Sequence, residues 1–448
     1  MQAKASYQNI ETKPSVSQRQ YLMLAIPLII SGISTPILGA VDTAVIGRMS
    51  DAAAIGGVAI GAVIFNTMYW LLGFLRVSTS GFTAQAQGAN DSQEMLLSFV
   101  RPMIIALLFG LLFIIFQKPI ITIALSVFGG SETVSSFAES YFVIRIWGAP
   151  FMLLSYVIIG WLIGMGKVRL SLITQIFMNL LNITLDIIFV FGFDMGIKGV
   201  AVATLIAEVS AVLLGIGIIL YTKQISFSSL KLSMLMEASP LLKMLKVNSD
   251  LFLRTVCLLT MTGMFTAMGA SMGEVTLAAN AILLQIHYIM AYLFGGFANA
   301  SSILVGRAIG GKQKPLYNRA FTLSAQWGFG SAVVMSLVML IIGQEVISFF
   351  TTISDVVATA NTLIIWMVIF PIFGFWGLQL EGIFSGATEA RPIRNSIFYA
   401  LLIFLLAIWL LVPAYLNHGL WLAFVLFSLS RSIFLSLYVP KLNKIINN

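Results

Sequence analysis

Charged residues are scarce in this chain. Asp, Glu, Lys and Arg make up 9% of its 448 residues, whereas apolar residues make up 59%. A soluble domain carries about 25% charged residues, so the composition excludes a soluble globular fold. Apolar runs of about 20 residues, the length of a helix that crosses a bilayer, recur along the whole chain. The sequence therefore predicts an all-α polytopic membrane protein.

Cysteine and histidine are also nearly absent. The single cysteine, Cys257, excludes an internal disulfide and gives no support to a metal cluster. The two histidines, His287 and His418, argue against a haem or zinc enzyme. We therefore predict no catalytic residue, no cofactor and no metal. His287 is alone in an apolar span and is expected to pack against other side chains.

Turn-forming clusters such as GRMSDAA and QGANDSQE divide the chain into twelve apolar spans. The longest hydrophilic connection, at 222–239, separates six spans from the next six. We predict a cytosolic tail at 1–19, a first lobe at 20–221, a cytosolic linker at 222–239, a second lobe at 240–440 and a cytosolic tail at 441–448. The spans are predicted at 20–46, 53–80, 95–117, 137–160, 168–191, 197–221, 240–268, 276–303, 317–342, 357–383, 393–413 and 418–440.

Lys and Arg are distributed unevenly between the two sides of these spans. Eighteen of them, Arg101 included, are assigned to the two tails and to the connections that lead from an even-numbered span to the next odd-numbered one. Only three (Arg48, Lys118 and Lys198) are assigned to the connections on the opposite side. This bias predicts that both termini are cytosolic and that the protein lies in the cell inner (plasma) membrane. The net charge of +8 then indicates topology and contact with anionic membrane lipids. It does not require a nucleic-acid partner.

The two halves of the chain resemble each other. GWLIGMGKVR (160–169) matches GIFSGATEAR (382–391) at an offset of 222 residues, and the same offset pairs Gly88 with Gly310. Six spans return the chain to the same side, so the halves are expected to be related by a pseudo-two-fold axis along the membrane normal, with substrate bound between them. This predicts two six-helix bundles and transport by alternating access. The sequence contains nothing that resembles the selectivity-filter loop of a channel.

A polar stripe runs through the fifth span. In TQIFMNLLNITLDIIFVFGF (174–193), Gln175, Asn179, Asn182 and Asp186 lie within about 60° of one another on an α-helix. A carboxylate in lipid costs at least a few kcal/mol. The stripe is therefore expected to face protein or water. Interhelical hydrogen bonding alone is the simpler alternative.

Other ionisable residues also fall within the spans. Asp42 follows Pro27 and Pro36 on the first span, and two prolines permit a bend there. Asp42 and Asp186 both fall towards the outer ends of their spans, so similar depths are expected. Arg254 is expected to pair with Asp250, four residues earlier. Functional and structural roles remain open for the rest: Arg76, Arg145, Glu208 and Glu381.

The two carboxylates have no counterpart in the second half. At the offset of 222, Asp42 corresponds to Met264 and Asp186 to Ile408. Poor hydration disfavours the ionised form of a carboxyl group, which can then hold either a proton or a cation. Asn179 and Asn182 could donate hydrogen bonds to it. The chain also has 33 Phe and 21 Met, which suit a cavity for flat lipophilic cations.

Three segments resemble the multidrug and toxic compound extrusion (MATE) family, in its DNA-damage-inducible protein F branch. They are GAVDTAVIGRMSDAAAIGGVAIG (39–61), NITLDIIFVFGFDMGIKGVAVAT (182–204) and NSDLFLRT (248–255). The resemblance implies two bundles in a V around a central cavity, exporting organic cations against protons or sodium. It implies that Asp42 is the coupling carboxylate of helix 1, with Asn182 and Asp186 as its partners on helix 5.

Three alternatives bear on coupling and substrate. Sodium-coupled members of the resembled family have an acidic residue early in helix 10, where PIFGFWGLQLEG (371–382) has Gly374, so we favour protons. A flippase of a lipid-linked substrate would need cationic residues in the cavity, for which Arg76, Arg145 and Arg254 are candidates. A membrane enzyme would need a polar catalytic cluster, and no such motif is found. The prediction is a monomeric, proton-coupled multidrug antiporter for lipophilic cationic drugs or dyes.

Overall fold

The structure is a computed structural model that describes residues 16–46, 52–128, 131–222 and 232–447. Within the first helix, the side chains of residues 35–44 and 46 are also outside the described set. Most of the predicted first tail, 1–19, and half of the predicted linker, 222–239, therefore lie outside the described residues. The predicted second tail, 441–448, is helical up to residue 447.

Helices form nearly all of the described chain, as the long apolar runs predicted. The first half contains α1 (Gln18–Ile46), α2 (Ala52–Leu71), α3 (Phe74–Gly88), α4 (Ser92–Ile115), α5 (Gln117–Phe128), α6 (Glu132–Arg145), the 3-10 turn η1 (Ile146–Gly148), α7 (Ala149–Gly164), α8 (Val168–Ile187), the π-turn η2 (Ile188–Gly192) and α9 (Gly196–Tyr221). The second half contains α10 (Leu232–Leu235), α11 (Ala238–Ser271), α12 (Glu274–Gly310), α13 (Lys314–Phe350), α14 (Ser354–Thr362), α15 (Ile364–Gly386), α16 (Ala390–Ser436) and α17 (Val439–Asn447).

Ten helical stretches among the described residues are long and apolar enough to cross a membrane. The first predicted span, at 20–46, coincides with α1, part of which is outside the described side chains, and raises the number to eleven. The twelfth arises because α16 contains two predicted spans, separated where the backbone of Leu416 leaves the helical region with a φ of 49°. The chain is thus a multi-pass membrane protein with twelve spans. The short α5, placed in a connection by the sequence prediction, is an additional helix.

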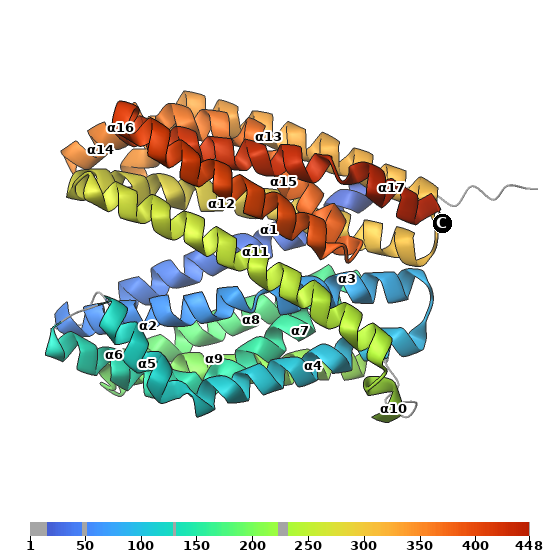
Figure 1. Ribbon diagram of the computed structural model, residues 1–448. Coiled ribbons are helices and arrows are strands. Elements are labelled where there is room, and N and C mark those ends of the chain that lie inside the picture. The colour runs from blue at the N-terminus through green and yellow to red at the C-terminus, as the bar shows by residue number, and fades with distance from the viewer. Residues whose placement is uncertain (1–15, 47–51, 129–130, 223–231, 448) are drawn as a thin grey trace, which may run out of the picture.

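The helices form two bundles (Figure 1). Helices α2–α9 make up one bundle and α11–α17 the other, while α1 runs between them and contacts both α8 and α12. Helix α11 crosses from the second bundle towards α10 and α4 of the first (Figure 1). We call the bundles the N-lobe (α1–α9) and the C-lobe (α11–α17).

Glycine contacts repeat between the lobes at the offset found in the sequence. In each lobe two glycines of one helix lie directly against backbone carbonyls of another helix. The approach is so close that a Cβ atom at either glycine would overlap the carbonyl oxygen. The pairs are Gly160 on Arg76 and Gly164 on Ser80 in the N-lobe, and Gly382 on Ala298 and Gly386 on Ser302 in the C-lobe. Every position in the second set is 222 residues after its counterpart. The lobes therefore share one internal packing scheme.

The lobes also meet each other through related glycines. Gly88 at the end of α3 lies against the backbone of Arg307, and Gly310 at the end of α12 lies against the backbone of Gln85. The offset of 222 turns each contact into the other, since residue 85 corresponds to residue 307 and residue 88 to residue 310. Such an exchange is what a two-fold axis between α3 and α12 produces. The fold is thus two six-helix bundles related by pseudo-two-fold symmetry.

Side chains extend this contact between the lobes. Arg307 donates from Nε to Gln87 Oε1 at 2.6 Å and from Nη2 to the carbonyl of Met165 at 3.1 Å. Gln85 donates from Nε2 to the carbonyl of Gly386 at 3.0 Å and to Thr388 Oγ1 at 3.2 Å. We call this set of contacts around Gly88 and Gly310 the seam. It joins the lobes at the ends of α3, α7, α12 and α15.

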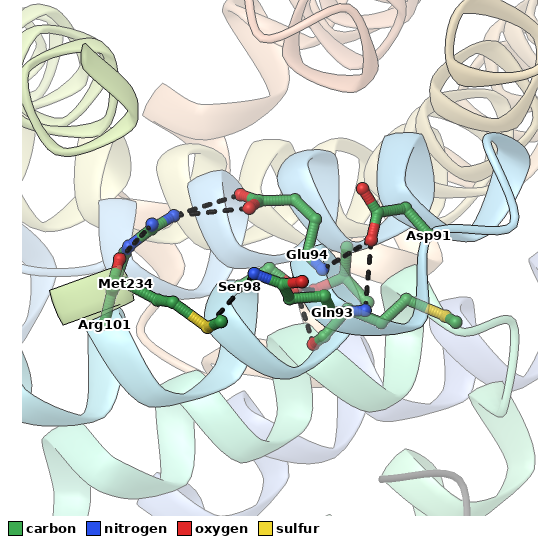
Figure 2. Close-up of polar contacts among 8 residues, drawn as sticks. Asp91, Gln93, Glu94, Ser98, Arg101 and Met234 are labelled. Atoms are coloured by element: carbon green, nitrogen blue, oxygen red, sulfur yellow. Dashed lines mark hydrogen bonds and ion pairs between the residues drawn. The ribbon is translucent and has the colours of Figure 1, made fainter. Parts of the chain in front are cut away.

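The described part of the linker rests on the N-lobe (Figure 2). Arg101 of α4 donates from Nη2 to the carbonyl of Met234 at 2.7 Å and pairs with Glu94 at 3.1 Å. Gln93 Nε2 lies 3.1 Å from Met234 Sδ. The assignment of Arg101 to a connection was therefore wrong, because α4 begins at Ser92 and includes it. Its side chain is 4% exposed.

Candidate functional site

The polar stripe predicted in the fifth span is buried along α8. Gln175 is 9% exposed, Asn179 6%, Asn182 2% and Asp186 0%. Helix α8 contacts both α1 and α9. Because the four residues recur at helical spacing, they share the face that is turned away from lipid. The prediction that this stripe faces protein is confirmed.

Hydrogen bonds join the stripe to both neighbouring helices. Asn179 donates from Nδ2 to Ser34 Oγ of α1 at 3.3 Å, and Asn182 donates from Nδ2 to Thr204 Oγ1 of α9 at 3.3 Å. The sequence reasoning missed Ser34 and Thr204 as partners. Thr204 is the last residue of the motif at 182–204, but its separation from Asn182 along the chain does not by itself indicate the pairing. The amides therefore fix the position of α8 between α1 and α9.

Asp186 lies at the end of α8, where the helix changes its winding. Its side chain is fully buried, and the π-turn η2 begins two residues later, at Ile188. A π-turn inserts an extra residue into the helix and is frequent at functional sites. The wider turn leaves a carboxylate in the protein interior where α8 ends and α9 approaches. An ionisable side chain is thus enclosed at the junction of α8 and α9.

The side chains of Asp42 and Pro36 lie outside the described residues. The backbone of α1 is described through Ile46, so Asp42 lies on a helix. Pro27 is on the same helix and is partly buried.

A second charged group in the N-lobe forms around Arg145. Arg145 donates from Nη1 to the hydroxyl of Tyr141 at 2.7 Å, and its guanidinium lies 4.6 Å from the ring centre of Phe65. Glu208 of α9 is 3% exposed and interacts electrostatically with Arg145. Opposite charges are therefore balanced within the N-lobe at this point. This arrangement favours the structural role for Arg145 and Glu208.

The C-lobe contains an ion cluster that joins three helices. Glu381 of α15 pairs with both Arg254 of α11 and Arg431 of α16. The predicted pair between Arg254 and Asp250 was wrong, because Asp250 pairs with Arg394 at 2.5 Å instead. Spacing along one helix could not reveal this, since α15 and α16 bring other charges within reach. Arg431 was missed altogether, although an arginine in SLSRSIF, inside the last span, was a visible signal.

His287 packs beside aromatic rings, as predicted. Its ring centre is 4.3 Å from that of Phe370 and 4.8 Å from that of Phe424, both in edge-on contacts. These contacts fill the interior of the C-lobe. The packing interpretation of His287 is therefore confirmed.

Arg76 has a different environment from the other charged residues of the spans. Its side chain is exposed, although it lies on α3, which packs against α7 of its own lobe and α12 of the other. It interacts electrostatically with Tyr156 of α7 and with Tyr292 of α12. Because these tyrosines belong to different lobes, Arg76 faces the space between the lobes.

A cavity of about 280 Å³ lies elsewhere, beside the contact of Figure 2. Its lining includes Phe82 and Gln85 of α3, Arg101 of α4 and Lys243 of α11. None of the predicted stripe residues lines it. It lies between α3, α4 and the start of α11, and no residue of α8 lines it.

Comparison with known proteins identifies relatives over most of the chain. The MatE family profile matches residues 27–188 and 251–411, one stretch in each lobe. DNA damage-inducible protein F of Escherichia coli (strain K12) is 37% identical over 415 residues, covering 92% of this chain and 90% of that protein. Multidrug export protein MepA of Staphylococcus aureus (strain MW2) is 23% identical over 397 residues, covering 86% of each.

A solved structure has the same fold. A MATE transporter from Vibrio cholerae superimposes with a TM-score of 0.85, covering 96% of this chain and 98% of that chain, at 19% sequence identity. At this identity the likeness concerns the fold. It agrees with the two lobes, the internal repeat and the twelve spans described above.

Proposed function

Because this chain belongs to the MatE family of multidrug and toxic-compound efflux transporters, we propose that it is a proton-coupled antiporter that exports lipophilic organic cations. Members of this family are transporters and not enzymes. The observation that carries the proposal is the buried stripe of α8, which ends in the fully buried Asp186. Amides alone would suffice to hold helices together, whereas a carboxylate at this depth adds a group that can be protonated.

The register of α1 against α8 supports a role for Asp42 beside Asp186. Ser34 of α1 accepts a hydrogen bond from Asn179 of α8, and both helices lead away from the seam end of the N-lobe. Asp42 follows Ser34 by eight residues and Asp186 follows Asn179 by seven, which are rises of about 12 and 10.5 Å along their helices. The two carboxylates are thereby proposed to lie at one level and to form a single proton site.

Exchange at this site would couple the proton to the drug. A protonated Asp42 would lose its attraction for a cation, and an ionised Asp42 in a cavity of low dielectric would regain it. Protons entering from outside would release the cation outward, and proton release to the cytosol would prepare the site for the next one. Pro27 and Pro36 on α1 would allow the helix to bend as its charge changes. Alternating access then requires the lobes to separate at the seam.

The orientation follows from the basic residues of the connections. With both termini in the cytosol and the protein in the plasma membrane, the seam is on the cytosolic side. The described arrangement would then be closed towards the cytosol. Arg307, a basic residue of a predicted cytosolic connection, contributes to this closure by its bonds to Gln87 and Met165.

We expect Asp42 and Asp186 to act as one unit. The variants Asp42→Asn and Asp186→Asn should each weaken cation binding, and the double variant should lose less than the sum of the two, by about 0.5–3 kcal/mol of coupling. The measurement is a double-mutant cycle, in which the dissociation constant of a fluorescent cation is determined for each purified protein. Thr184→Val, on the exposed face of α8, is the control. Strictly additive losses would show that the two carboxylates work independently.

Cation binding should release a proton. If the cation replaces the proton of the site, binding at a pH where the carboxyl group is largely protonated releases up to one proton per monovalent cation, and affinity falls as the pH is lowered. Calorimetry in buffers of different ionisation enthalpy counts the proton. The Asp42→Asn variant should release none. An affinity that does not change between about pH 5 and pH 8, where a buried carboxyl group titrates, would contradict direct competition.

A further inference from the structure

Positive charge exceeds negative charge in the ion cluster of the C-lobe. Arg254 and Arg431 share the single carboxylate of Glu381, which leaves a net charge of +1. The Nε atoms of both arginines are buried and have no hydrogen-bond partner among the described residues. The other ion pairs described in the chain, such as Arg394 with Asp250, join one base to one acid. This cluster therefore keeps donor capacity that its own carboxylate does not use.

The cluster is accessible at one side. The side chain of Arg254 is 21% exposed, that of Glu381 13% and that of Arg431 11%. Helix α11, which carries Arg254, contacts α2 and α3 of the N-lobe. The three residues thus form an interior group that is partly exposed, and one of them, Arg254, is on the helix that contacts the other lobe.

Arg76 lies at the same level on the N-lobe side. Gly160 touches the backbone of Arg76, and its counterpart Gly382 touches that of Ala298. A pseudo-two-fold axis along the membrane normal places Gly160 and Gly382 at equal depth, and Glu381 is the neighbour of Gly382. None of the ion pairs among the described residues includes Arg76. Three guanidinium groups and one carboxylate among the described side chains thus lie near this depth.

We propose that this group, the arginine level (Arg76, Arg254, Arg431 and Glu381), binds the acidic group of a lipophilic substrate. Uncompensated positive charge in a medium of low dielectric attracts an anion strongly. The planar guanidinium also matches the two oxygens of a carboxylate. Glu381 bridges Arg254 and Arg431 and limits the attraction for an anion, so that the substrate can leave.

The arginine level is separate from the proton site. Asp186 lies 18 residues beyond Val168, the start of α8, which is a rise of about 27 Å. Gly160, at the arginine level, lies one turn before the end of α7 at Gly164, on the side of the chain where α8 begins. An acidic group bound there would meet the arginines and would not face Asp186. This inference depends on the proposed function only in that the same transporter moves the substrate.

Binding of two dyes that differ in one charge tests the proposal. A rhodamine with a free carboxylate and its methyl ester share the same cationic ring system, so their affinity ratio isolates the acid group. Fluorescence polarisation with purified protein gives this ratio without requiring transport. For the unmodified chain we expect the carboxylate dye to bind at least as tightly as the ester. A preference for the ester of about tenfold or more would overturn the proposal.

Two substitutions that change the charge of the arginine level in opposite directions make the test more specific. Arg254→Gln removes one positive charge and should lower the affinity ratio of carboxylate to ester about tenfold, the loss of one charge-assisted hydrogen bond. Glu381→Gln removes the negative charge and should raise the ratio. A merely structural cluster would respond in the same direction to both changes, or the ratio would not move at all, and either result would refute the proposal.

Two controls separate binding from folding and from the proposed function. Arg394→Gln makes the same chemical change in an ion pair outside the arginine level and should leave the ratio at its original value. Arg254→Lys keeps the charge and should recover part of the ratio. Export of the ester dye under a proton gradient tests the proposed function by itself. If that export fails while the affinity ratio shifts as expected, the coupling proposal is wrong and the arginine level stands.

Discussion

Replacing Asp42 by Asn is expected to abolish export driven by a pH gradient. The amide has the size of the carboxylate but cannot take up or release a proton, so neither the attraction for the cation nor its loss on protonation remains. Because proton exchange is the step that drives the cycle, we expect a loss of about two orders of magnitude or more rather than a change in affinity alone. Proteoliposomes loaded with a fluorescent cation, under an imposed proton gradient, give the rate.

A matched control and a second gradient make this experiment decisive. Asp194→Asn makes the same change at an exposed aspartate after η2 and should export at the original rate. A sodium gradient of equal size should drive little export by the unmodified protein. Retention of proton-driven export by Asp42→Asn at every external pH would refute the assignment. Export driven by sodium and not by protons would replace the proton by sodium in the coupling scheme.

Much of the fold could be predicted from the sequence because the membrane imposes its own length scale. A helix must satisfy its backbone groups internally in lipid, so each apolar run of sufficient length became a helix at nearly the expected position. The repeat was also visible, because the close approach of two helices admits only glycine at positions such as Gly160 and Gly382. The helix α5 was not foreseen, because a short amphipathic segment beside the spans gives no comparable signal.

The candidate site was predictable only along a single helix. The spacing of Asn179, Asn182 and Asp186 placed them on one face, and their burial agrees with it. Which groups they meet depends on neighbouring helices, so Ser34 and Thr204 could not be derived from spacing. The same limit explains the wrong pairing of Arg254. A local partner four residues away is worth only about 0.2–0.5 kcal/mol, and a carboxylate brought close by another helix in a poorly hydrated interior outweighs it.

Placing a methyl group at Gly310 is expected to prevent the lobes from closing at the seam. The Cβ of Gly310→Ala would overlap the carbonyl oxygen of Gln85, and neither backbone can yield without separating α12 from α3. Overpacking of this kind costs about 1–3 kcal/mol, and it acts only in the closed state. A cost of that size shifts the balance between the states about 5- to 150-fold. Export should fall accordingly, because the cycle must pass through both states.

Cross-linking can follow the closed state directly. In a Cys257→Ser background, Gln85→Cys and Thr388→Cys replace two side chains that are hydrogen bonded across the seam, and a short reagent with two thiol-reactive groups should join them when the seam is closed. Adding Gly310→Ala should lower the yield, as should Gly88→Ala at the counterpart position, where a Cβ would overlap the backbone of Arg307. Gly295→Ala is the control, since a Cβ there meets open space on the same helix as Gly310. Equal cross-linking in the Gly310→Ala and Gly295→Ala proteins would mean that the glycines do not govern closure. Because alanine favours a helix more than glycine does, a loss confined to the seam positions would reflect the contact between the lobes and not a weaker helix.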